Sequence, residues 1–271
     1  MNQTTINQLL ALNADFYQQT AQSFSDSRAY FWSGWDQLLP IILQNTTQIS
    51  TLKVLDLGCG NARFAEFLAK NIPSYQILRY YGWDNSADLL NHAQQKIANN
   101  ILNDSQIDLH PQTSFVLDLI DLTQANSSKL LEQKSPFQII TLFGVLHHLP
   151  AQNNRLKILQ TLAKQLQPQG LLIFSLWQFM KDPRLAARVI EPAVFPSPLQ
   201  QTFLEENDYL LDWKRSATNN ALRYCHNFTD QEISELVVSL QNTAQLKLIK
   251  QFTADGPQNN PLNTYLVFLK K

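Results

Sequence analysis

The residues best placed to bind a ligand lie in the turn between Asp56 and Gly60, at the end of the apolar run 53–57. Gly58 and Gly60 let the backbone turn sharply and bring a ligand against the N-terminus of the next helix. A carboxylate at Asp56 argues against a dinucleotide, because a pyrophosphate would occupy that position. It suits a ligand with positive groups, such as the ammonium and sulfonium of S-adenosylmethionine, whose own carboxylate can accept from the amides of the turn.

Two further acidic residues end later apolar runs. Asp84 stands 24 residues after Gly60, where a carboxylate can accept both hydroxyls of a ribose. Asp118 ends a third run and is suited to accept from an adenine amino group. Each residue alone is equally compatible with a turn or a helix cap. Because the carboxyl ends of parallel strands meet at one edge of a sheet, the three together predict a single ligand crevice with Asp56.

Short apolar runs alternate with longer amphipathic stretches, which predicts strand–helix–strand units and a parallel sheet. The predicted strands are 53–57, 77–83, 114–119, 137–143 and 171–177, and the helices among them are 64–72, 87–101 and 155–166. A capping box at Thr229 and Glu232 starts a helix over 229–240. The runs 247–252 and 264–269 follow, and their connection is too short for a crossover helix, so we expect them to be antiparallel. Two further helices are expected over 6–24 and 35–43.

Composition narrows the functional class. The 271 residues carry a formal net charge of -1, which excludes a globally basic coat for nucleic acid but leaves room for a local basic patch. Cys59 and Cys225 are far apart and have no metal-ligand spacing, so we expect reduced thiols and no metal. The polar start predicts no signal peptide, and no apolar run is long enough to span a membrane. We therefore expect a cytoplasmic protein with no membrane partner.

Glycine is scarce, with only 7 residues, and most of them stand where a side chain would interfere with the predicted site. Gly58, Gly60, Gly82 and Gly144 fall at or near the ends of predicted strands around the crevice. Gly34 alone has no role that the sequence explains.

The core motifs resemble those of the class I S-adenosylmethionine-dependent methyltransferases. The likeness covers about residues 50–180 and the last two strands, and it includes the paired His147 and His148 after the fourth strand. It implies a Rossmann-like α/β fold, with a mostly parallel seven-stranded sheet, an antiparallel last strand and helices on both faces. Ala62 and Gln169 depart from the family pattern, which usually has Gly at both places.

We predict one domain, 1–271. It divides into an N-terminal helical cover (1–50), a cofactor-binding core (51–178), an acceptor-recognition insertion (179–228) and a C-terminal helix and hairpin (229–271).

The flanks resemble the wobble-uridine tRNA methyltransferases, which esterify a carboxymethyl group on that base. The likeness rests on Phe16-Tyr17 with the segment 24–28, and on Arg223-Tyr224-Cys225-His226. It departs at Cys225, where the family usually has Tyr, and at 263–265. The resemblance implies a tRNA anticodon loop as partner, and a small zinc-binding activator that covers an apolar sheet edge such as 115–122.

Arg28 is our candidate to pair with the methionine carboxylate, and Tyr17 to cover the cofactor. His147 and Cys59 are expected to pack against it. The full predicted set for S-adenosylmethionine is Tyr17, Arg28, Asp56, Gly58, Cys59, Gly60, Asp84, Asn85, Asp118, Leu119, Phe143 and His147.

An acceptor carboxylate is already ionised at neutral pH, so its methylation needs a cation and no general base. The candidate cations are Arg223, His226 and Lys214, although Arg223 is equally compatible with an ion-paired loop residue.

Two other functions stay open, a methyltransferase for a quinone-like or carboxylic small molecule and a non-catalytic cofactor-binding scaffold. Basic residues gathered at the site's mouth would favour RNA, whereas an enclosed apolar pocket would count against it. The basic residues concerned are Arg184, Arg188, Lys214, Arg215 and Arg223.

Overall fold

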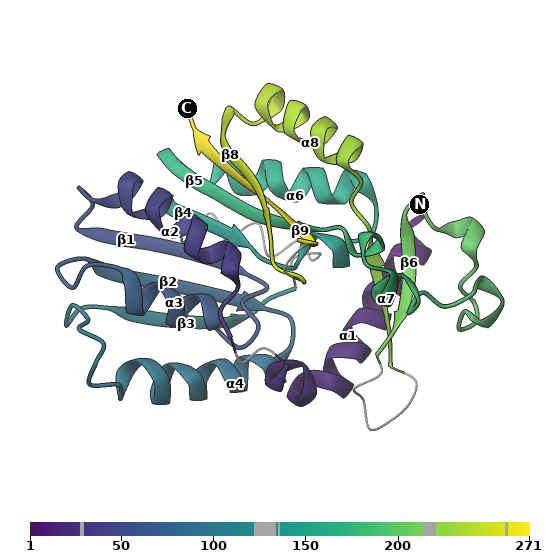
Figure 1. Cartoon of the computed structure of the whole chain (residues 1–271), viewed down its shortest axis with the longest axis horizontal. Coiled ribbons are helices and arrows are strands. Elements are labelled where there is room, and N and C mark those ends of the chain that lie inside the picture. The colour runs from purple at the N-terminus through teal and green to yellow at the C-terminus, as the bar shows by residue number, and fades with distance from the viewer. Residues whose placement is uncertain (28–29, 122–133, 135, 214–220, 258–259) are drawn as a thin grey trace.

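A computed structural model describes residues 1–27, 30–121, 134, 136–213, 221–257 and 260–271. Its centre is a seven-stranded sheet of order β3-β2-β1-β4-β5-β9-β8 (Figure 1). The strands are β1 (Thr51–Leu57), β2 (Ile77–Asp84), β3 (Ser114–Leu119), β4 (Phe137–Leu142), β5 (Leu166–Trp177), β8 (Leu246–Ala254) and β9 (Asn263–Lys270). Strands β1 to β5 pair in parallel, and β9 runs antiparallel to both β5 and β8. The predicted fold class is confirmed.

Helices bury both faces of this sheet. Alternate side chains of β5 take part in different cores, because successive residues of a strand point to opposite faces. Leu171 and Ile173 pack in the core of one face, and Leu172 and Phe174 in the core of the other. The first face is covered by α2 (Ser33–Thr46), α3 (Arg63–Asn71) and α4 (Ala87–Ile97), the second by α6 (Gln152–Lys164) and α8 (Asp230–Thr243). This two-sided burial explains the nearly continuous apolar runs in the sequence.

Hydroxyl side chains cap the starts of α4 and α8. The Ser86 hydroxyl accepts from the Leu89 amide at 3.3 Å, and α4 ends four residues before the predicted limit, in a π turn (Ala98–Leu102). The Thr229 hydroxyl accepts from the Glu232 amide at 3.1 Å, although the Glu232 side chain turns to His226 instead of completing the capping box. Short single turns connect the remaining elements: η2 (Leu146–His148), η3 (Phe179–Lys181), α7 (Pro183–Ala186), η4 (Pro192–Val194) and η5 (Gln201–Phe203).

The insertion contains a two-stranded antiparallel ribbon, β6 (Asp208–Asp212) and β7 (Leu222–His226), which the sequence did not predict. The long N-terminal helix α1 (Gln3–Asp26) packs against β7 (Figure 1). The Asn13 side chain accepts from the Tyr224 amide at 2.8 Å and donates to the Tyr224 carbonyl at 3.3 Å. On the other side of the ribbon, the Ile190 amide donates to the Leu210 carbonyl at 2.9 Å.

Strand β3 forms one edge of the large sheet, and its Val116 and Leu119 side chains are exposed. Leu122, the last residue of the apolar run expected to receive an activator, lies outside the described residues. Within the described chain, no helix combines the length and the apolar character needed to cross a membrane.

Gly34, which had no role in the sequence, lies in α2 directly against the ring of Tyr265 on β9. A Cβ atom at Gly34 would overlap the ring and stand 2.6 Å from its hydroxyl oxygen. That hydroxyl donates to the Asp255 carboxylate, which also accepts from the Gly34 amide at 3.1 Å. The glycine therefore allows α2 to approach the sheet closely.

Replacing Gly34 by Ala is expected to destabilise the fold by about 1–3 kcal/mol, because the methyl group overpacks against a buried ring. Urea unfolding measures the loss. In a Tyr265→Leu background the same change is expected to be neutral or stabilising, since Leu has no atoms at the ring's far end and Ala favours a helix over Gly by about 1 kcal/mol. An equal loss in both backgrounds would contradict this packing.

Candidate functional site

One cavity of about 920 Å³ opens at the carboxyl ends of β1, β2, β4 and β5, where residues of α1 and the segment before α2 also line it. This is the sheet edge at which the acidic residues were expected to meet. Its lining includes nine of the predicted cofactor-binding residues: Tyr17, Asp56, Gly58, Cys59, Gly60, Asp84, Asn85, Phe143 and His147. Arg28 lies outside the described residues.

The turn after β1 has the left-handed backbone that its glycines favour. Gly58 has φ +66° and Gly60 φ +53°, and a Cβ at Gly58 would overlap the Val145 side chain. Ala62 also takes φ 57°, which accounts for Gly being the usual residue there in the family it resembles. Cys59 between the glycines is buried, its pKa is raised well above the usual value by burial, and its sulfur packs against Gly82. It acts as a packing residue and not as a nucleophile.

Asp56 presents a buried carboxylate whose two oxygens bind hydroxyl groups from neighbouring strands. Tyr80 donates to Oδ2 at 2.5 Å and Thr141 to Oδ1 at 2.6 Å. Burial raises the pKa of Asp56 to about 6, although these two hydrogen bonds lower it. The carboxylate is therefore largely ionised at neutral pH, and a ligand cation beside it would compensate its desolvation.

Asp84 connects the end of β2 to the turn after β1. Its Oδ2 accepts from the Gly60 amide at 2.8 Å, and its Oδ1 accepts from the Ser86 amide at 2.9 Å. Burial raises the pKa of Asp84, while the amide hydrogen bonds oppose that rise. Each oxygen keeps further acceptor capacity, so the carboxylate can still accept two ligand hydroxyls.

The third acidic residue does not border the cavity, contrary to our expectation. Asp118 accepts from the Trp83 indole at 3.0 Å and pairs with Lys134 at 2.6 Å. The register of β3 on β2 sets Asp118 beside Trp83, and it leaves Leu119 exposed. The chain reaches the cavity only beyond the strand, with Ile120 and Asp121, which the sequence analysis did not identify.

Aromatic rings and histidines form another part of the cavity wall. The Tyr17 hydroxyl lies 2.8 Å from His148 Nε2, and the His147 ring lies 5.0 Å from that of Trp177, measured between centroids. Phe143 packs on Phe64, with 4.9 Å between ring centroids. Three more residues that line the cavity are Arg63, His148 and Trp177, and of these Arg63 was not identified from the sequence.

The three candidate cations for the acceptor have different positions. Arg223 is buried and lines the cavity, with its guanidinium 5.1 Å from the centroid of the Trp177 ring. His226 is buried and is not among the cavity residues, because Asp208 holds its Nδ1 at 2.8 Å and Glu232 its Nε2 at 2.7 Å. Burial would lower the pKa of His226, but these two carboxylates raise it. Lys214 lies outside the described residues.

The other basic residues of the insertion do not gather at this cavity where the structure describes them. Arg184 and Arg188 line a separate depression of about 290 Å³, and Arg184 pairs with Asp182 at 2.8 Å. Arg215 lies outside the described part of the chain.

The residues present fit S-adenosylmethionine. Asp56 offers a buried negative charge to an ammonium group, and Asp84 offers acceptors to the ribose hydroxyls. The glycine turn brings backbone amides near the N-terminus of α3 for a carboxylate. The cavity volume also lies at the upper end of the usual range for small-molecule sites, which leaves room for a second ligand.

Residues 13–239 match a family model described as a methyltransferase domain. The fold is similar to an S-adenosylmethionine-dependent methyltransferase from Clostridium acetobutylicum, with 12% identity and a TM-score of 0.60 over 95% of this chain and 97% of that one. A second such enzyme, from Methanosarcina mazei, has 15% identity and a TM-score of 0.58 over 85% and 97%.

The Burkholderia thailandensis 1,6-didemethyltoxoflavin-N1-methyltransferase, solved with that compound and S-adenosylhomocysteine, has 13% identity and a TM-score of 0.58 over 98% of this chain and 90% of its own. No curated protein matches the chain in sequence.

Binding of S-adenosylmethionine is expected to weaken as the pH falls through about 6, because protonation removes the Asp56 charge that attracts the ligand. One pH unit below that pKa, the affinity is expected to be about tenfold lower than its plateau at higher pH. Calorimetry across this range measures the profile. Asp56→Asn supplies the control: it is expected to bind weakly and to lack the transition near pH 6. A wild-type profile identical to that of Asp56→Asn would refute the assignment.

Proposed function

The chain belongs to the class I S-adenosylmethionine-dependent methyltransferases, and from this we propose that it methylates an acceptor carboxylate held by Arg223. The buried state of the Arg223 guanidinium is the observation that carries the proposal. Among the described residues Arg223 forms no ion pair with a carboxylate, and its buried Nε has no hydrogen-bond partner. A buried cation without a counterion is costly, so an anionic ligand in the cavity would stabilise it.

The surroundings of Arg223 favour a planar, charge-delocalised partner. Its guanidinium lies 5.1 to 5.4 Å from the ring centroids of Phe16, Trp177 and Trp213. These rings exclude water and hold the side chain by cation–π contacts. A guanidinium fixed in this way can bind both oxygens of a carboxylate, which orients that group for attack.

The chemistry divides between the ligand and the protein. When bound, S-adenosylmethionine supplies an electrophilic methyl group on its sulfonium. Asp56 and Asp84 fix the ligand at the carboxyl edge of the sheet, while Arg223, which lines the same cavity, holds the acceptor. An ionised carboxylate carries no proton to remove, so His147 and His148 need not act as bases.

The acceptor we favour is a carboxymethyl-modified uridine of tRNA. The motifs around Tyr17 and Arg223 support it, and both residues line the cavity. Single-stranded bases are bound by stacking on aromatic side chains as much as by charge, and Trp177 in the cavity wall suits such a base. This mode of binding is compatible with a chain of nearly neutral net charge.

A small carboxylic acid is the second candidate acceptor. It is favoured by the separation of Arg184 and Arg188 from the cavity, because a polyanion would gain most from cations gathered at the mouth. The Arg223 anchor serves both acceptors.

Transfer of a labelled methyl group to total tRNA and to a small-metabolite extract separates the two. For a tRNA ester, nuclease digestion moves the label into a nucleoside, and mild base releases it as methanol. Label that enters only small molecules would exclude tRNA, and label that is stable to base would exclude a carboxylate acceptor.

Replacing Arg223 by Gln is expected to lower kcat/KM for the acceptor about 100-fold or more, because the acceptor carboxylate loses its buried partner. The Kd for S-adenosylhomocysteine is expected to stay within about twofold, since other residues bind the cofactor. Arg223→Lys keeps the charge without the fork and should recover only part of the rate. Arg79→Gln, an exposed change of equal charge on β2, is the matched control. Equal losses in both Gln variants would refute the anchoring role.

A further inference from the structure

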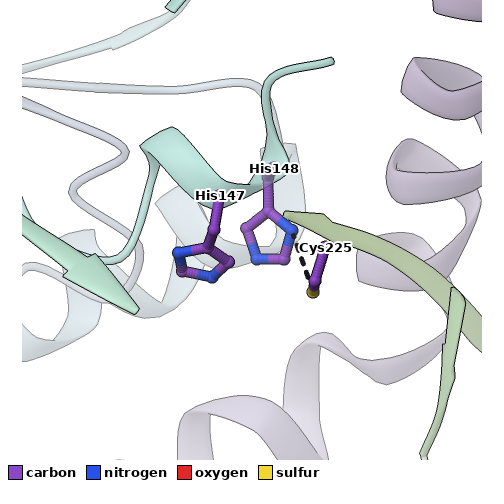
Figure 2. Close-up of side chains that lie close together, drawn as sticks. All are labelled: His147, His148 and Cys225. Atoms are coloured by element: carbon purple, nitrogen blue, oxygen red, sulfur yellow. Dashed lines mark hydrogen bonds between the residues drawn. The ribbon is translucent and has the colours of Figure 1, made fainter. Parts of the chain in front are cut away.

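Three side chains with metal-binding atoms converge on the cavity wall that contains Arg223. His147 and His148 come from the turn η2 after β4, and Cys225 comes from β7 (Figure 2). One ligand atom from each residue lies within 4.8 Å of the others. The two histidines line the cavity, while Cys225 is buried behind them.

We propose that His147, His148 and Cys225 bind one Zn²⁺ ion, with its fourth coordination position directed toward the cavity. Two imidazoles and a thiolate form a mixed nitrogen and sulfur set, which zinc prefers over the oxygen-seeking Mg²⁺ and Ca²⁺. Three protein ligands with one open position are typical of zinc sites that bind water or a substrate atom. This site goes beyond methyl transfer and revises our expectation that the chain binds no metal.

The separation of His148 and Cys225 fits tetrahedral coordination. His148 Nδ1 lies 3.8 Å from Cys225 Sγ, as the dashed line in Figure 2 marks. Zinc bonds of about 2.0 Å to nitrogen and about 2.3 Å to sulfur place such ligand atoms roughly 3.5 Å apart. The ring of His147 lies 4.1 Å from that of His148 between centroids, and its ligand atom lies within 4.8 Å of the other two.

Metal binding at Nδ1 keeps one hydrogen bond of His148 and replaces another. Binding there requires the imidazole proton on Nε2, which can then donate to the Tyr17 oxygen at 2.8 Å. The ion takes the place of the hydrogen bond that Nδ1 donates to the Tyr224 carbonyl at 3.0 Å, and that carbonyl keeps its bond from the Asn13 side-chain amide at 3.3 Å. Tyr17 thus acts as a positioning residue for the ligand, as the outer partners of metal-bound histidines commonly do.

The thiol must lose its proton when the ion binds. Burial raises the pKa of Cys225 to about 11, and the positive charge of Arg223 opposes that rise. The zinc–sulfur bond replaces the sulfur–hydrogen bond, and the proton leaves to solvent. The zinc–thiolate–imidazole unit carries a net charge of about +1, which suits a water molecule or an anionic oxygen at the open position.

Spectroscopy of the Co²⁺-substituted protein tests the site. We expect chelator-treated protein to bind one equivalent of Zn²⁺ by calorimetry, and Co²⁺ to give tetrahedral d–d bands with a thiolate charge-transfer band. Cys225→Ser is expected to abolish the thiolate band and to weaken Zn²⁺ binding by about 100-fold or more. Tyr17→Phe is expected to keep the band while weakening binding about tenfold.

Two matched variants control for adventitious binding. Cys59→Ser removes the other thiol, and His92→Ala removes an imidazole on α4 outside the cluster. Both should retain the band and the affinity. Cys225→Ala, with its fold checked by circular dichroism, repeats the test where Ser in a buried site disturbs folding. Absence of one-equivalent binding in the wild type, or a thiolate band that persists without Cys225, would overturn the proposal.

Discussion

Two buried carboxylates, Asp56 and Asp84, impose the central constraint on this molecule. Removing a carboxylate from water is costly unless donors surround it. The donors here come from different elements: hydroxyls of Tyr80 on β2 and Thr141 on β4, and amides of Gly60 in the turn and Ser86 at the cap of α4. Satisfying these charges therefore fixes how three strand ends and two helix starts meet. The shape of the cofactor cavity follows from that arrangement.

The core of this arrangement was predictable because its signals are local. Asp56 and the two glycines lie within five residues, and the strand that leads into them is buried over its last four residues. The expectation that Asp118 lines the cavity was wrong because a partner on another strand decides where its side chain lies. Trp83 lies beside it in the parallel register and donates to its carboxylate, and no spacing in the sequence reveals that pairing.

The insertion was harder to predict because its contacts connect distant parts of the chain. His226 resembles a ligand-binding histidine in its sequence motif, yet Asp208 and Glu232 occupy both ring nitrogens. Cys225 and His148 are separated by most of the insertion and still lie in contact. The cofactor cavity thus depends on the ends of neighbouring strands, whereas the acceptor side that we propose combines α1, the η2 turn and the ribbon.

The small ribbon of β6 and β7 has a further consequence. An isolated two-stranded sheet exposes unpaired backbone groups on both edges, which can recruit strands from other molecules. On β7 the side-chain amide of Asn13 accepts a hydrogen bond from the backbone N–H of Tyr224 and donates one to its carbonyl, as a neighbouring strand would. On β6 the segment 188–190 does the same through the amides of Ile190 and Asp212. Neither edge is therefore open to intermolecular strand pairing at these positions, so the ribbon can border a ligand site without promoting aggregation.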